Sequence, residues 1–152
     1  MNEQPVISVE RLTNTHLPAV KIIEESCFSD PWSERSLEMF TKDGGRGFVC
    51  LLDGTPAAYC GALTVLDEAD IARIATLPQF RRKGLAVRLL EALFDLCASE
   101  NIKRVTLDVR ESNTPALELY RSVGFSVTGR RRDYYNRPQG EKDLIWALSS
   151  YE

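Results

Sequence analysis

The sequence predicts a single α/β domain of the α+β type, in which helices pack against a mixed sheet. Segments with alternating apolar residues and segments with helical apolar spacing follow one another as strands, helices and strands again. This order is typical of a three-layer architecture of helices and sheet, not of a bundle or a barrel. The length of 152 residues fits one hydrophobic core. We therefore expect residues 1–152 to form one domain.

The first part of the chain predicts a strand followed by two helices. Residues 6–11 alternate as in a strand, and the apolar residues of 17–27 recur at helical spacing. A turn at 29–31 precedes a short helix, which starts at Ser33 and is stopped by the glycines of 44–47. We expect this short helix to form one wall of a cleft.

The middle of the chain predicts three more strands. Residues 48–52 and 57–65 flank Asp53-Gly54, a dipeptide that favours a tight hairpin because the glycine accepts a positive φ. Residues 71–76 also alternate, and the strand they form should end at Leu77-Pro78, since proline removes a ladder donor.

The last part of the chain predicts two helices and three strands. Residues 84–100 carry one apolar face of a long amphipathic helix, and residues 105–110 alternate as a strand. A second helix fits between Asn113-Thr114-Pro115 at its start and Gly124 at its end. Residues 125–128 and 144–148 then alternate as two strands, separated by a long polar segment.

Composition and charge narrow the class of protein. The chain is 43% hydrophobic with a net charge of −3, which favours an ordered globular protein and argues against nucleic acid as the main partner. Its first residues lack the basic start and apolar stretch of a signal peptide, and no apolar run reaches membrane-spanning length, so we expect a cytoplasmic location and no membrane role. The only histidine is His16, and the cysteines are widely spaced, so we expect reduced thiols and no metal site. The cysteines are Cys27, Cys50, Cys60 and Cys97.

The loop at residues 81–86 is the most specific feature of the chain. It reads Arg-Arg-Lys-Gly-Leu-Ala and lies between a strand end and the long helix. Gly84 and Ala86 let backbone N–H groups approach an anion, and first-turn N–H groups of a helix have no intrahelical partner. A pyrophosphate could bind there, its charge screened by the cationic side chains. Taken alone, the loop also fits an ordinary capped turn.

The unit Ile74-Ala75-Thr76-Leu77-Pro78-Gln79-Phe80, followed by Arg81-x-x-Gly84-x-Ala86 and an amphipathic helix, resembles the acetyl-coenzyme A signature of the GNAT acetyltransferases. Other motifs, spread from about Val9 to Leu148 in the family's order, resemble the RimI family. These motifs are Phe28-x-x-Pro31-Trp32-Ser33-Glu34, Asp67-Glu68-Ala69, Leu107-Asp108-Val109-Arg110-x-Ser112-Asn113, Ala116-Leu117-x-Leu119-Tyr120, Gly124-Phe125, Arg132-x-Tyr134-Tyr135 and Glu141-x-Asp143.

The resemblance implies the GNAT acyl-CoA N-acyltransferase fold, with a central, mostly antiparallel sheet flanked by helices. It also implies acetyl-CoA as the cosubstrate, without a metal. RimI proteins are N-terminal alanine acetyltransferases whose bacterial substrate is a small-subunit ribosomal protein, so the expected partner is a protein N-terminus. We expect the protein to act as a monomer or weak dimer, with no direct nucleic-acid role.

The resemblance also assigns the cofactor-binding residues. The main chain of Ile74, Ala75 and Thr76 would hydrogen-bond the pantetheine arm, as a strand edge can hold an extended amide chain. Asn113 would reach the cofactor from the loop before the last helix, although asparagine is also a common helix cap. The pyrophosphate would be held by Arg82, Lys83, Gly84, Leu85, Ala86 and Val87.

Acetyl transfer requires a neutral amine, so a base that accepts the ammonium proton helps. The family uses a glutamate on the strand before the Arg-x-Ser-Asn loop as the base and a tyrosine on the following helix as the acid, and here these places hold Asp108 and Tyr120. Aspartate is one methylene shorter, so its carboxylate would fall about 1.5 Å short, and a bridging water could restore the contact. The alternatives are a half-buried aromatic for Tyr120 and a pairing with Arg110 or another cation for Asp108.

Further residues are candidates for the site. Glu68 is the reserve base, although a solvated surface carboxylate is the alternative. Trp32, Tyr134 and Tyr135 could wall a peptide cleft, although core packing explains Trp32 equally well. Glu24 or Glu25 on the first helix could contact an arginine-rich substrate tail, although exposed helix carboxylates are usually only solvated.

Two other functions remain open from the sequence. The coenzyme motif identifies the donor and not the acceptor, so a small amine or a lysine side chain could be acetylated instead. A noncatalytic acyl-CoA-binding module would also keep the pyrophosphate loop, with Asp108 marking the loss of the base.

Overall fold

The computed structural model describes residues 4–110, 112–132 and 142–149, with side chains as far as Thr128. In this part of the chain a seven-stranded sheet has the strand order β1-β2-β3-β4-β5-β7-β6. Among the described strands, only β4 and β5 pair in parallel, and every other neighbouring pair is antiparallel. The strands are β1 Ile7–Arg11, β2 Gly45–Leu52, β3 Thr55–Val65, β4 Glu68–Thr76, β5 Arg104–Arg110, β6 Ser126–Arg132 and β7 Lys142–Ser149.

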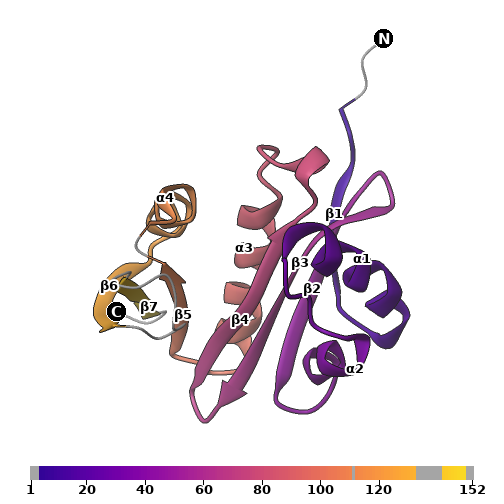
Figure 1. The fold of residues 1–152 in the computed structure, drawn as a ribbon. Helices are drawn as coiled ribbons and strands as arrows, with labels where there is room; N and C mark the ends of the chain where they lie inside the picture. Colours follow the sequence, from indigo (N-terminus) through magenta and orange to yellow (C-terminus); the bar gives the residue numbers. More distant parts are fainter. Residues whose placement is uncertain (1–3, 111, 133–141, 150–152) are drawn as a thin grey trace.

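Helices cover both faces of this sheet, which gives three layers (Figure 1). The helices α1 and α2 lie on one face with the short turn η2, and α3 and α4 lie on the other. No helix of the described residues is long and apolar enough to cross a membrane. The α-helices are α1 Leu17–Cys27, α2 Glu34–Leu37, α3 Leu85–Ser99 and α4 Thr114–Ser122, and the 3-10 turns are η1 Asn14–His16, η2 Glu38–Thr41 and η3 Pro78–Phe80.

The two helix layers enclose two hydrophobic cores. On the α3 side, Leu89, Leu90 and Leu93 are fully buried against the sheet at the spacing that the amphipathic pattern predicts. On the α1 side, Val20 and Ile23 pack with residues of η2 and with Tyr59 of β3. The sheet is therefore buried on both faces, as expected of a three-layer fold.

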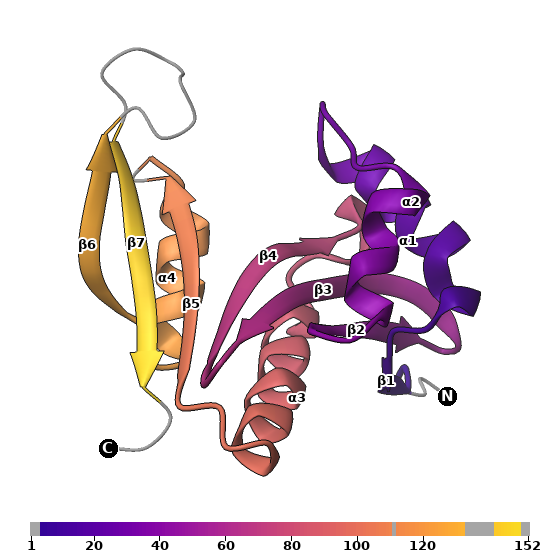
Figure 2. The same ribbon diagram turned by 90° about the horizontal axis from the view of Figure 1, so that it is seen from below.

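The strands β4 and β5 diverge partway along their length. They pair only from Glu68–Ile71 with Arg104–Leu107, yet β4 continues to Thr76 and β5 to Arg110. Figure 2 shows the two strands separating beyond this point. Strand edges that carry no partner present N–H and C=O groups for a further extended chain.

A bulge in β4 lies at the start of this divergence. Opposite β3, Gly61 pairs with Arg73 and Ala62 pairs with Ile71, so Ala72 is the extra residue. A bulge interrupts the alternation of a strand and re-aims the side chains that follow it. Arg73 consequently faces α1, whereas Ile71 and Ile74 pack on the α3 side.

The predicted elements are present, with differences at their boundaries. Asp53 and Gly54 both have positive φ, of 51° and 82°, as a tight primed hairpin turn requires. The side chain of Ser33 accepts a hydrogen bond from the Ser36 backbone N–H at 3.1 Å, which caps α2 where the sequence predicts its start. The prediction that residues 44–47 only stop a helix is incomplete, because β2 begins at Gly45. The polar segment predicted after β6 lies mostly outside the described residues.

Candidate active site

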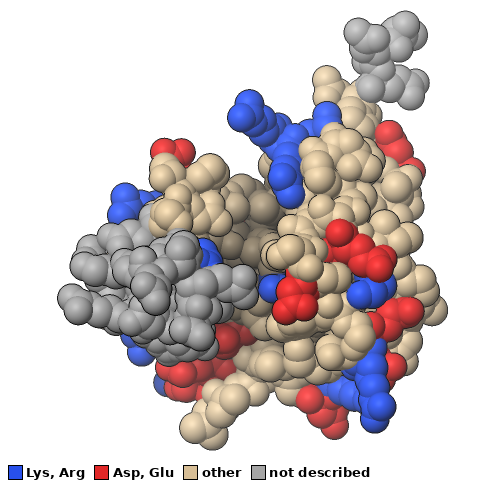
Figure 3. Space-filling model, in the orientation of Figure 1, with Lys and Arg blue, Asp and Glu red and all other residues tan. Residues whose placement is uncertain are grey.

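Two joined cavities occupy the space where β4 and β5 separate. The larger, of about 720 Å³, lies between the end of β4, the loop before α3, and α4. The smaller, of about 490 Å³, lies between β4, β5 and the α1–α2 loop. Ile74, Asn113 and Tyr120 line both cavities, so they mark the junction between the two. Figure 3 shows the surface hollowed between the two halves of the molecule.

The larger cavity has an anion-binding end at the start of α3. Arg82 and Gly84 are left-handed, with φ of 63° and 77°, and Gly84 is the N-cap residue directly before α3. No side chain of the described residues caps this helix, and its first turn contains no acidic residue. The Arg88 N–H donates to the Gly84 carbonyl, so the first-turn N–H groups before Arg88 have no helical acceptor. These groups and the helix dipole favour a negatively charged ligand.

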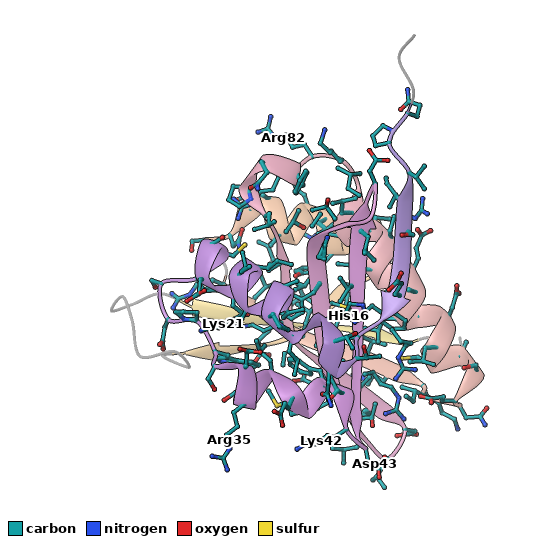
Figure 4. All side chains as sticks on the ribbon, turned by 90° about the vertical axis from the view of Figure 1, so that its right-hand side faces the viewer. His16, Lys21, Arg35, Lys42, Asp43 and Arg82 are labelled. Carbon is teal, nitrogen blue, oxygen red and sulfur yellow. The ribbon has the colours of Figure 1, made fainter. Side chains whose placement is uncertain are left out.

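Gly84 fits this role for a second reason. A Cβ atom built at this position would meet no other atom within 4 Å, so the space beside the backbone is open. Figure 4 shows Arg82 projecting from the same end of the molecule into solvent. An anionic group can therefore approach the main chain of this loop closely while a cation lies near it.

The open edge of β4 forms the wall next to this anion site. The Leu77 N–H donates to the Ala57 carbonyl of the β3 side at 2.9 Å. Because backbone groups alternate along an antiparallel ladder, Ala75 also bonds toward β3, whereas Ile74 and Thr76 point into the divergence. The Thr76 carbonyl already accepts from Cys27 Sγ and Arg81 Nε, each at 3.2 Å. The main-chain groups of Ile74 and the Thr76 N–H remain for an extended amide ligand.

Tyr120 places a neutral phenol at the junction of the cavities. Tyr120 is only 6% exposed, and its ring packs edge-on against the ring of Phe125, with the two centroids 5.6 Å apart. Burial, with a smaller contribution from the nearby Cys60 thiol, raises the pKa of Tyr120 to about 12. The phenol therefore stays protonated near neutral pH and can donate a proton to a basic leaving group.

Asp108 contributes a carboxylate to the smaller cavity. It lies on β5, half-buried, and its side chain is on the face opposite to the buried Leu107 and Val109. Asp108 and Tyr120 thus line the same cavity from a strand and from the following helix. An acid and a base facing one cavity can serve a transfer reaction that moves protons.

The comparisons with known proteins agree with this geometry. The family model described as "Acetyltransferase (GNAT) family" matches residues 17–125. A [ribosomal protein bS18]-alanine N-acetyltransferase of Salmonella typhimurium is 39% identical over 140 residues, which cover 91% of this chain and 93% of that protein. The enzyme of the same name from Escherichia coli is 36% identical over 138 residues, with the same coverage of both chains. The chain belongs to the RimI family of GNAT acetyltransferases.

Solved structures show the same relationship. The crystal structure of the ribosomal-protein-S18-alanine N-acetyltransferase from Escherichia coli superposes with a TM-score of 0.87 at 33% identity, covering 97% of this chain and 96% of its own. A Bacillus anthracis acetyltransferase in complex with acetyl coenzyme A has a TM-score of 0.81 at 15% identity, which shows the GNAT fold alone. It covers 95% of this chain and 98% of its own.

The structure brings together all but one of the residues that the GNAT resemblance assigns to the cofactor. Lys83 lines neither cavity. Asn113 caps α4, since its Oδ1 accepts from the Ala116 N–H at 3.3 Å. It also lines the larger cavity, so one residue is both a helix cap and part of the cavity wall. The assigned residues that line the larger cavity are Ile74, Ala75, Thr76, Arg82, Gly84, Leu85, Ala86, Val87 and Asn113.

The prediction of Glu68 as a reserve base is wrong. Glu68 lies at the start of β4, where its carboxylate is 3.7 Å from Arg104, and it lines neither cavity. It is separated from Ile74 by about 20 Å of extended strand, at about 3.3 Å per residue. Glu68 is therefore on the strand that borders both cavities, but at the end of that strand away from them.

The aromatic and acidic candidates have mixed outcomes. Trp32 lines the smaller cavity and also stacks on Phe40, with ring centroids 5.9 Å apart, so it packs in the core and its role toward a peptide stays a prediction. Tyr134 and Tyr135 lie outside the described residues. The prediction that Glu24 is an exposed helix carboxylate is wrong, because it is completely buried.

Sequence reasoning missed Arg73, which lines the smaller cavity and pairs with Glu24. Both residues occupy positions where the apolar pattern predicts a hydrophobic side chain. Glu24 follows Val20 and Ile23 on the buried stripe of α1, and Arg73 interrupts the apolar run of residues 71–75 in β4. Two opposite charges at positions where the pattern predicts apolar residues could have indicated a buried ion pair, since buried charges are almost always paired.

Proposed function

We propose that this protein transfers acetyl from acetyl-CoA to the N-terminal α-amine of a protein in the cytoplasm, and that its acceptor is the N-terminal alanine of ribosomal protein bS18. The observation that carries the proposal is the neutral phenol of Tyr120 at the junction of two cavities, one suited to an anionic extended ligand and one bearing a carboxylate. The names of relatives that cover most of the chain support the choice of acceptor.

The residues of the larger cavity fit the donor. The backbone N–H groups at the start of α3 and the side chain of Arg82 would hold the pyrophosphate, and Lys83 would add positive charge from outside the cavity. The open main-chain groups of Ile74 and Thr76 would align the pantetheine amides, and Asn113 would contact the same arm near the junction. When bound, acetyl-CoA supplies an acetyl group activated as a thioester.

The residues of the smaller cavity fit the acceptor. The α-amine arrives mostly protonated near neutral pH, since its pKa is about 8, and it must lose a proton before it can attack. Asp108 would take that proton through a water, because its side chain is one methylene shorter than glutamate. Trp32 would form part of the wall against which the peptide lies.

Tyr120 would complete the transfer. The new N–C bond forms as the C–S bond breaks, and the sulfur leaves with the electron pair of the broken bond. The phenol donates its proton to that sulfur and is reprotonated when the amine nitrogen loses its second proton. The buried position of Tyr120 raises its pKa further, so the phenol stays neutral at alkaline pH as well.

The test is acetyl transfer to two short peptides, with the product located by mass spectrometry. One peptide starts with free Ala-Arg, and the other has the same N-terminus blocked and carries an internal lysine. The proposal predicts acetylation at the free N-terminus and none on the lysine. Modification of the lysine would overturn the acceptor assignment, and coenzyme binding without transfer to either peptide would favour a small amine or a noncatalytic module.

A further inference from the structure

An ion pair joins Arg73, which lines the smaller cavity, to the buried Glu24. Arg73 Nε donates to Glu24 Oε2 at 3.1 Å, and Arg73 Nη2 donates to Glu24 Oε1 at 3.3 Å. Glu24 has no exposed surface, and the side chain of Arg73 is 19% exposed. The Tyr59 hydroxyl also donates to this carboxylate. The glutamate therefore fixes the plane of the guanidinium through a two-point contact.

Arg73 and Glu24 also contact the loop between α1 and α2, residues 28–33. The guanidinium carbon of Arg73 lies 3.9 Å from the ring centroid of Phe28 and 4.4 Å from that of Trp32. The backbone N–H of Trp32 donates to Glu24 Oε1 at 2.8 Å, and Lys21 Nζ donates to the backbone carbonyl of Trp32 at 2.9 Å. The loop is thus held at its main chain and at both aromatic rings. Arg73 has little freedom to turn away from the cavity.

One edge of the guanidinium remains for a ligand. Arginine has five N–H donors, and here Nε and Nη2 are used by Glu24, with a longer contact of 3.4 Å from Nη2 to the Asp30 carbonyl. Within the described part of the chain, no acceptor is found for Nη1. Arg73 lines the smaller cavity, so an acceptor bound there lies beside the guanidinium.

We propose that Arg73, fixed by Glu24, determines acceptor specificity by donating a hydrogen bond to the main-chain carbonyl of the acceptor's first residue. This inference rests on the proposed function, because it concerns the acceptor in the smaller cavity. A carbonyl oxygen is the group that an unused guanidinium N–H requires, and the charge of Arg73 is already balanced by Glu24.

The position of this carbonyl separates the classes of amine. In an N-terminal residue the carbonyl oxygen lies within about 3.6 Å of the reacting nitrogen, by standard bond lengths. In an extended lysine side chain the residue's own carbonyl is about 8 Å from the reacting nitrogen, and simple amines have none. A site that donates to a group present in one acceptor class disfavours those that lack it, because the donor is left unpaired.

The test uses a pair of peptides that differ in the first amide. One is the free Ala-Arg peptide, and the other has this amide replaced by a trans alkene, which keeps the length and removes the carbonyl oxygen together with the N–H of the second residue. The part of the discrimination that disappears in the Arg73 variants reports on the carbonyl. The value of kcat/KM for each peptide gives a discrimination ratio. We expect the unaltered protein to prefer the amide peptide by tenfold or more, chiefly through a lower KM.

Two variants address Arg73. Arg73→Lys keeps a positive charge beside Glu24 but loses the planar fork, and Glu24→Gln with Arg73→Met removes both charges so that neither is left buried alone. We expect the ratio to fall several-fold in the first and to within about threefold of unity in the second. Coenzyme affinity should not change, since Arg73 lines only the smaller cavity.

Arg46→Met is the matched control. Arg46 is also a sheet arginine paired with a glutamate, at 2.8 Å from Glu100, with a side chain 22% exposed, and it lines neither cavity. This variant should keep the full ratio. A ratio retained by folded Arg73 variants would overturn the role of Arg73 alone, whereas failure of the unaltered protein to acetylate the amide peptide would overturn the proposed function with it.

Discussion

Replacing Gly84 with alanine should have two separate effects, a loss of stability from the backbone and a loss of affinity for acetyl-CoA. Gly84 has φ of 77°, so a side chain there costs about 1–2 kcal/mol of stability. A new Cβ would meet no protein atom within 4 Å, so no clash adds to this cost. In a chain of this size the melting temperature should fall by about 2–8 °C.

The binding effect follows from the position of Gly84 in the larger cavity. A side chain there occupies space that an anion needs to reach the first-turn N–H groups of α3. Hydrogen bonds to a charged group contribute about 1.5–3 kcal/mol each, so loss of one predicts an affinity for acetyl-CoA about 10- to 100-fold weaker. Gly84→Val should weaken binding further than Gly84→Ala.

Gly54→Ala is the control for this experiment. Gly54 has φ of 82°, and a Cβ there would also meet no atom within 4 Å, but it lies in the β2–β3 hairpin and lines neither cavity. It should show the same loss of melting temperature and unchanged affinity in calorimetric titration with acetyl-CoA. Equal affinities for the Gly84 and Gly54 variants would refute the placement of the pyrophosphate at the start of α3.

Three further predictions concern the acid, the base and a buried thiol. Tyr120→Phe should lower kcat about 100-fold or more with unchanged coenzyme affinity, and rapid kinetics showing full activity would remove the proton-donor role. Asp108→Asn should lower kcat/KM about 100-fold, and Asp108→Glu should retain or raise kcat/KM. Both values come from steady-state assays with the Ala-Arg peptide. A fully active asparagine variant would contradict the assignment of Asp108 as the base. Burial raises the pKa of Cys60 to about 12, so this thiol supports stability below pH 9 and loses that contribution as pH rises toward 12. Alkaline denaturation followed by circular dichroism should therefore show a smaller loss of stability over this range in Cys60→Ala, and an unchanged loss would contradict the buried, neutral thiol.

Local signals account for the parts of the fold that the sequence predicts. The Asp53-Gly54 turn depends on two adjacent residues that tolerate positive φ, and the start of α3 depends on Gly84 for the same reason. The amphipathic spacing of α3 is visible within its own segment. Features of this kind are encoded over a few residues, so they can be read without knowing the rest of the structure.

The features that were missed depend on contacts between distant segments. Glu24 and Arg73 are 49 positions apart, and only the packing of α1 on β4 brings them together. The bulge at Ala72, which turns Arg73 toward α1, has no glycine or proline on β4 itself to signal it. Glu68 failed as a candidate for a related reason, because a motif fixes the strand but not which end of it reaches the cavity.

The most direct test of the central claim is the reaction of the protein with full-length, unacetylated ribosomal protein bS18 and acetyl-CoA. Intact-mass measurement followed by fragmentation would locate the product. The account predicts one added acetyl group, on the N-terminal alanine, with a much slower reaction for Tyr120→Phe. Acetylation at internal lysines, or at the N-terminus with no dependence on Tyr120, would contradict the account.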